Sequence, residues 1–197
     1  MSRPKVVQIG FNKTGTTSLA RFFKNNGYTV AGGEIAIKAF RNIQEQRDPL
    51  HNLEFDLAQD IENHKLGIYI YNYFELIHNH HPDAKFILTT RSCEKWINSR
   101  LSHNGGRYVR RALRRLGLHN VETLCDTWRR DFYHYHAKVL DYFSGRPNFY
   151  IHSLECLNVA SLTEFLSPEF KFHDLTYPHS NPKRAKTPVS YDLSIED

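Results

Sequence analysis

The sequence is poor in cysteine, with only three among its 197 residues. The three lie far apart and form no Cys-x-x-Cys pair, so the sequence indicates neither a disulfide framework nor a zinc site. Long apolar runs are also missing, and none approaches the roughly 20 residues that a transmembrane helix needs. The first residues lead directly into an apolar stretch at 6–9, without the longer apolar region of a signal peptide. These absences predict a cytoplasmic protein with reduced thiols and no integral membrane segment.

The excess of positive charge is modest. A net charge of +5 favours anionic ligands. It does not by itself indicate nucleic acid, because a polyanionic cofactor or an acidic acceptor would account for it equally well. Twelve histidines are present, but no spacing typical of metal ligands appears, so no metal is expected. The length predicts a single domain over residues 1–197 with a substantial core.

Short apolar runs alternate with segments of helical periodicity along the chain. Strands are expected at residues 6–9, 28–31, 55–58, 85–90 and 148–151. Helices are expected at residues 19–26, 34–46, 66–80, 94–103, 107–116, 121–143 and 157–166. This alternation predicts an α/β fold with an open parallel sheet covered on both faces, followed by a basic tail from about residue 168. Ligands bind such sheets at the carboxyl ends of the strands, where the segments after residues 9 and 90 should lie.

A loop rich in glycine and threonine, residues 10–18, follows the first expected strand. The N–H groups of such a turn, and the start of the helix after it, attract anions. Further donors come from four hydroxyls and one lysine, those of Lys13, Thr14, Thr16, Thr17 and Ser18. The combination suits a phosphate or a sulfate.

The loop differs from the ATP-binding pattern G-x-x-x-x-G-K-[ST]. Gly10 and Gly15 have the required spacing, but Thr16 stands where the lysine belongs. The lysine has moved to Lys13, before the second glycine. This displacement argues against a nucleotide or small-molecule kinase, which stays open as an alternative together with a non-catalytic nucleotide-binding protein.

Two motifs resemble sulfotransferases that use 3′-phosphoadenosine 5′-phosphosulfate (PAPS). The run at 12–18, NKTGTTS, is similar to the loop that holds the 5′-phosphosulfate in that family. Arg91 follows the strand 85–90 and Ser99 lies eight residues later, like the family's arginine and serine at the 3′-phosphate. Residues 82–91, before Trp96, also resemble small soluble members of the family.

The resemblance implies a three-layer αβα fold with a central parallel sheet, like that of P-loop-containing nucleotide hydrolases. It implies transfer of a sulfuryl group from PAPS, without a metal, to a hydroxyl or amine on a small molecule or saccharide. Lys13 would stabilise the leaving phosphate. The loop would bind the cofactor through Lys13, Thr14, Gly15, Thr16, Thr17 and Ser18, and the last three would hold its 5′-phosphate. The resemblance names neither the acceptor nor an oligomeric state.

Other positions carry further expectations. In the family, a basic loop near the C-terminus often closes over the 3′-phosphate, so Lys183 or Arg184 is a candidate here. A catalytic base should accept the proton of the acceptor. Glu34 is the first candidate, because several carbohydrate-modifying members carry a catalytic glutamate shortly after the second strand, and Asp60 is the second. The arginine-rich face of the helix 107–116 is either solvated or a contact for an anion.

Overall fold

The computed structural model describes residues 3–178. Contacts between backbone positions divide these residues into two compact units. The first comprises residues 3–91 and 143–178, and the second residues 92–142. Each unit is treated separately below. Among residues 3–178, every helix is too short or too polar to cross a lipid bilayer.

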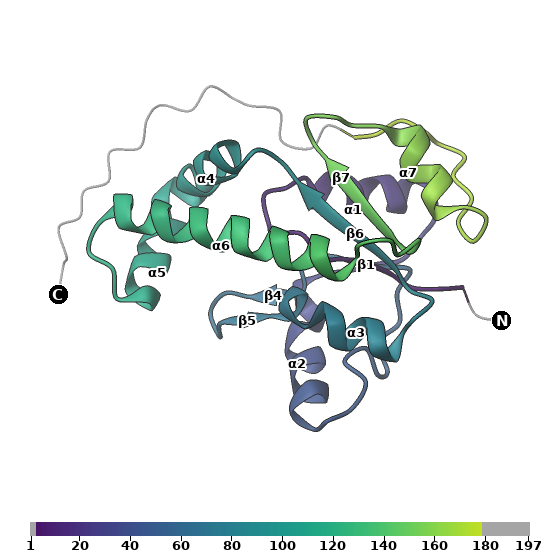
Figure 1. Cartoon of the computed structure of the whole chain (residues 1–197), viewed down its shortest axis with the longest axis horizontal. Helices are drawn as coiled ribbons and strands as arrows, with labels where there is room; N and C mark the ends of the chain where they lie inside the picture. The colour runs from purple at the N-terminus through teal and green to yellow at the C-terminus, as the bar shows by residue number, and fades with distance from the viewer. Residues whose placement is uncertain (1–2, 179–197) are drawn as a thin grey trace. The chain divides into compact units, whose positions relative to one another are not determined.

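The first unit is built on a five-stranded parallel sheet (Figure 1). Its strand order is β2-β3-β1-β6-β7. The strands are β1 (Val6–Gln8), β2 (Val30–Ala31), β3 (Leu57–Ala58), β6 (Lys85–Thr90) and β7 (Phe149–Ser153). The parallel α/β sheet expected from the sequence is therefore confirmed. Because β1 lies between β3 and β6, the loops after these three strands meet at one edge.

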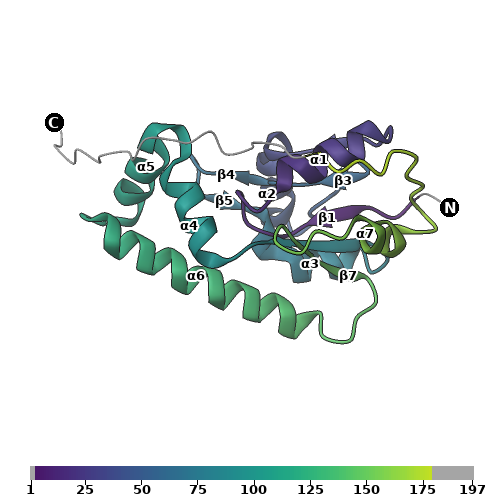
Figure 2. The ribbon, with the colours of Figure 1, turned by 90° about the horizontal axis from the view of Figure 1, so that it is seen from above.

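Helices cover both faces of this sheet, as a three-layer fold requires (Figure 2). The unit contains α1 (Thr16–Asn25), α2 (Ala36–Gln44), α3 (Phe74–His80) and α7 (Val159–Leu166), with 3₁₀ turns η1 (Gly33–Ile35) and η2 (Ile70–Tyr73). Neighbouring residues of β6 show the two faces. Ile87 belongs to the cluster under α1 and α7, whereas the ring of Phe86 packs against His78 of α3. Side chains of a strand alternate in this way, so a strand buried on both faces is apolar throughout.

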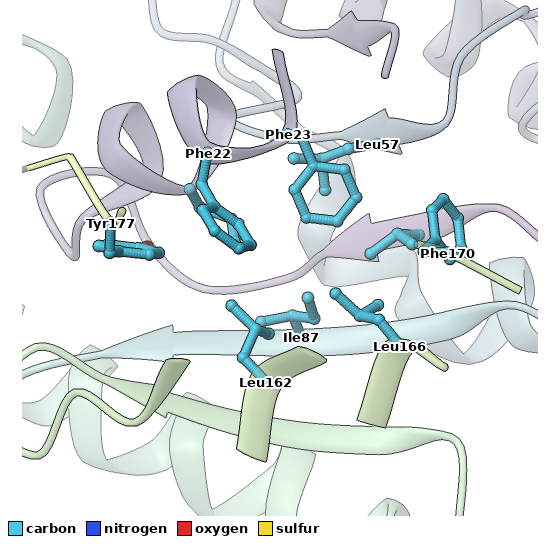
Figure 3. Packing of buried hydrophobic residues seen from close by; sticks show 10 residues of the cluster. Phe22, Phe23, Leu57, Ile87, Leu162, Leu166, Phe170 and Tyr177 are labelled. Atoms are coloured by element: carbon cyan, nitrogen blue, oxygen red, sulfur yellow. The ribbon is translucent and has the colours of Figure 1, made fainter. Parts of the chain in front are cut away.

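The main core cluster joins α1 and α7 over the sheet (Figure 3). Phe22 and Phe23 of α1 are fully buried, as are Leu162 and Leu166 of α7. The segment 168–178, expected as the start of an irregular tail, also packs into this cluster. It contributes Phe170, Phe172 and Tyr177, and the hydroxyl of Tyr177 lies 2.7 Å from Nε2 of buried His152.

One expected element is wrong. Residues 66–80 do not form a single helix, because their first part is a strand of an antiparallel hairpin made by β4 (Glu62–Asn63) and β5 (Ile68–Tyr69). Gly67 has a φ of 69°, a conformation that favours glycine and turns the chain. The apolar residues at helical spacing belong to η2 and α3, which continue from the hairpin.

The second unit is helical. It contains α4 (Cys93–Leu101), the 3₁₀ turn η3 (His103–Gly106), α5 (Arg107–Leu116) and α6 (Val121–Tyr142). The buried guanidinium of Arg100 lies 3.9 Å from the ring centre of Trp96 and 5.2 Å from that of Trp128. The ring centre of Tyr108 of α5 lies 5.5 Å from the same guanidinium. These cation–π contacts join the three helices around one charge.

Candidate functional site

The loop between β1 and α1 lies directly against β6. A side chain at Gly10 would collide with the backbone oxygen and the hydroxyl of Thr89, so only glycine fits. Gln8 fixes the same approach, because its Nε2 donates to the Gly10 oxygen at 2.8 Å and to Thr89 Oγ1 at 2.7 Å. Gly15, with a φ of 96°, then turns the chain into α1. The loop is thus held where the strands end.

Two of the predicted hydroxyl donors of the loop have different surroundings. The hydroxyl of Thr14 is fully buried and is already bonded, to the Phe11 oxygen and to Thr89 Oγ1 at 2.7 Å. Thr17, by contrast, is exposed in the first turn of α1. The first N–H groups of a helix have no acceptor within the helix, and they carry a partial positive charge. The start of α1 therefore has the polarity that favours an anion, and the binding of a phosphate there stays a prediction.

Arg91 meets this loop although it lies 78 residues further along the chain. It follows β6 directly, and its Nη1 donates to the Lys13 oxygen at 3.3 Å. Its Nε is buried and has no hydrogen-bond partner within residues 3–178. A buried donor without a partner is costly, and an anionic ligand would satisfy it. Lys13 and Arg91 thus lie at the same edge of the sheet.

Two other predictions cannot be placed at this edge. Ser99 lies on α4, in the second unit, where it is half-buried. Lys183 and Arg184 lie outside the described residues. Their proposed contacts with the 3′-phosphate stay predictions.

Asp60 is held beside the loop, two residues after β3. Its Oδ2 accepts a hydrogen bond of 2.6 Å from the Thr16 hydroxyl, and its backbone N–H donates to Gln8 Oε1 at 3.0 Å. Its Oδ1 is buried and has no hydrogen-bond partner among residues 3–178. The pKa of Asp60 is raised to about 6, mainly by burial and in smaller part by the nearby Glu62 charge, while the Thr16 hydrogen bond and the charge of Lys13 oppose the rise. A carboxylate with a pKa near neutrality suits a general base.

Glu34 has a different environment. It is exposed in η1, and its Oε1 accepts a 2.6 Å hydrogen bond from the N–H of Gly32, two residues earlier. The carboxylate therefore closes its own turn. Of the two predicted bases, Asp60 has the surroundings that a proton acceptor needs.

Sequence reasoning missed the hairpin β4–β5 beside the loop. Glu62 Oε1 accepts from Asn12 Nδ2 at 2.8 Å and lies 2.8 Å from His64 Nε2. His64 Nδ1 in turn lies 3.3 Å from the Tyr69 hydroxyl. This chain of contacts ties the residue before Lys13 to the hairpin. The alternating polar residues 62 and 64 were the available sign of a strand. The helix expected from residue 66 left no room for its partner strand at 68–69.

Aromatic rings lie beside the loop, next to the hairpin β4–β5. The rings of Phe11 and Tyr71 meet edge to face with centres 5.3 Å apart, and Tyr69 and Tyr71 lie 5.7 Å apart. Phe11 is buried, whereas both tyrosines are half-buried. The charged end of the site is thereby flanked by an apolar wall.

Two comparisons bear on this arrangement. A family model described as a sulfotransferase domain matches residues 5–159. The match includes the loop after β1, Asp60 and Arg91. A comparison with curated proteins finds no match.

Proposed function

The chain belongs to the sulfotransferase domain family of transferase enzymes, and we propose that it transfers a sulfuryl group from PAPS to a hydroxyl or amine acceptor. One observation carries this proposal. Lys13 belongs to the loop 10–18 at the carboxyl edge of the sheet, and both Arg91 and the buried carboxylate of Asp60 form hydrogen bonds with that loop. Sulfuryl transfer needs a group of each kind: a cation for the leaving phosphate, donors for the nucleotide and an acceptor for a proton.

The donor would bind at the start of α1. Its 5′-phosphate fits the N-terminal end of the helix and the hydroxyls of Thr17 and Ser18. We assign Thr14 to shaping the loop, because its hydroxyl is already bonded within the protein. Arg91 offers to the second phosphate of the nucleotide its planar guanidinium, whose Nε has no partner among the described residues.

The reaction follows from these positions. An oxygen or nitrogen of the acceptor attacks the sulfur in line, and the bond between sulfur and the bridging phosphate oxygen breaks. Lys13 stabilises the negative charge that grows on that bridging oxygen. Asp60 receives the proton of the acceptor on Oδ1, the oxygen for which the described part of the chain supplies no hydrogen-bond partner. Because sulfuryl is less charged than phosphoryl, no metal is required in this scheme.

Thermal unfolding with ligands tests the donor class. We expect 3′,5′-adenosine bisphosphate to stabilise the protein by about 2.7 kcal/mol at 100 times its dissociation constant. Stabilisation by ATP with Mg²⁺ alone would instead support the kinase alternative. Binding of the bisphosphate without turnover of labelled PAPS, over a range of acceptors, would support a non-catalytic nucleotide-binding protein.

A pair of lysine variants tests whether Lys13 takes part in turnover. Lys13→Ala should abolish most turnover, whereas Lys24→Ala, which removes an exposed lysine near the other end of α1, should not. Equal turnover in the two variants would remove Lys13 from the mechanism.

A further inference from the structure

Helix α5 carries four arginines on one face. They are separated by three, four and seven residues, so they share one side of the helix. We call them the arginine stripe: Arg107, Arg110, Arg111 and Arg114. All four are exposed. The opposite face of α5 is buried through Val109, Ala112 and Leu113.

The arginine stripe has no acidic counterpart within residues 3–178. None of its members forms an ion pair or hydrogen bond with a carboxylate there. The same unit does pair arginine elsewhere. Arg129 of α6 donates to Glu94 at 2.8 Å and to Asp126 at 2.6 Å. The positive charge on α5 is therefore a local feature, and not a property of every arginine in the unit.

Helix stability does not explain the arginine stripe. Like charges three and four residues apart destabilise a helix, and Arg107 and Arg110 form one such pair. Arg107 also stands at the N-terminus, where the helix dipole disfavours a cation, and no acidic residue occurs in the first turn. Packing of the buried face and the contact of Tyr108 with Arg100 hold α5 in place instead. The charges are thus available for a ligand.

We propose that the arginine stripe is a binding surface for an acidic oligosaccharide that carries sulfate or carboxylate groups. A guanidinium offers two parallel donors that match the oxygens of a carboxylate or a sulfate. From Arg107 to Arg114 the helix rises about 10 Å, so the ligand must present several charges along its length.

Two other polyanionic partners fit less well. Single-stranded nucleic acid needs exposed aromatic rings on which bases stack. Tyr108, the aromatic residue of α5, instead lies against Arg100 and Trp128. A helix that lies in a membrane surface inserts its apolar face, but the apolar face of α5 is buried in the protein.

Binding measured without donor tests the proposal directly. The stripe variant replaces Arg107, Arg110, Arg111 and Arg114 by Gln. The control removes the same number of charges from exposed positions elsewhere, replacing Lys24, Arg41, Lys65 and Lys171 by Gln. We expect the dissociation constant of a fluorescent heparin-derived hexasaccharide to rise at least tenfold in the stripe variant and less than threefold in the control. The stripe variant should unfold at a temperature no lower than the parent.

Several results would overturn the proposal. An equal loss of hexasaccharide affinity in the two variants would show only general charge attraction. Unchanged affinity in both variants would show that the stripe does not bind the oligosaccharide. If single-stranded RNA or anionic vesicles bound to the stripe more tightly than the hexasaccharide, the partner of the stripe would be a nucleic acid or a membrane and not an oligosaccharide. Stabilisation by 3′,5′-adenosine bisphosphate should be the same in both variants. If that stabilisation is missing in the parent while the hexasaccharide still binds at the stripe, the donor assignment fails and the stripe assignment stands.

Discussion

Replacing Asp60 by Asn should stabilise the protein and abolish turnover together. The carboxylate is buried beside the loop. Its Oδ2 is bonded to the Thr16 hydroxyl, and its Oδ1 has no partner in residues 3–178. An uncharged amide of the same shape avoids the cost of burying a charge, and its oxygen can still accept from Thr16. It cannot take a proton from an acceptor, so the chemical step would lose the base that we propose for it.

The magnitude follows from the raised pKa. Burial raises the pKa of Asp60 from 3.8 to about 6. A raised carboxyl pKa means that the folded state favours the proton, so stability is lost as pH rises through about 6. The difference of about two units corresponds to about 3 kcal/mol at pH near 7.5, and to about 1 kcal/mol at pH near 4.5, where most of the folded molecules carry the proton. The Asn variant lacks this titration and should be more stable than the parent by these amounts.

Urea unfolding of Asp60→Asn and the parent at the two pH values measures the difference. Glu34→Gln is the matched control, since it makes the same kind of replacement at an exposed carboxylate that closes only a local turn. A stability gain of the Asn variant that is equal at both pH values would refute the titration argument. Retained turnover in Asp60→Asn, with turnover lost in Glu34→Gln, would move the base to Glu34.

Three further changes test other parts of the structure. Lys13→Ala should lower kcat by about 10²–10³-fold, measured with labelled PAPS, because it removes one stabiliser of the leaving oxygen. Tyr177→Phe should cost about 1 kcal/mol in urea unfolding, because His152 loses its partner. Burial lowers the pKa of His152 to about 4, so the stability that the neutral ring contributes is present above about pH 6.5 and is lost as pH falls towards 4. Gly10→Ala should destabilise the protein by about 1–3 kcal/mol, because the new methyl group meets Thr89; an unchanged unfolding midpoint would show that the loop can move away from β6.

The sequence predicted the parts of the site that lie within one continuous segment. The loop 10–18 could be predicted as an anion site because a strand, two glycines, four hydroxyls and a helix follow one another, and anion binding there stays a prediction. The segment 85–91 could be identified in the same way, as an apolar strand that ends in an arginine. Short-range order of this kind is visible in the spacing of residues, and the structure places both segments at one edge.

The sequence could not rank the two candidate bases, because the ranking depends on neighbours distant in the chain. Asp60 is buried by the loop 44 residues earlier, through Thr16, and by Gln8. The sequence offered no reason to treat Glu34 differently from Asp60, yet the Glu34 carboxylate accepts a hydrogen bond from the backbone of its own turn. The hairpin β4–β5 was missed for a related reason, since its strands have two residues each and their pairing, not their composition, defines them.

The position of Asp60 has a consequence for the order of events at the site. Its carboxylate lies next to the loop proposed for a phosphate, and Glu62 adds a second negative charge. An ionised Asp60 therefore repels a bound donor, while the opposite charge of Lys13 offsets part of that repulsion. Because linkage is reciprocal, donor binding must raise the pKa of Asp60 above its value in the free protein. The proposed base would then be more basic with the donor in place, and would accept a proton most readily when the proposed sulfuryl transfer can follow.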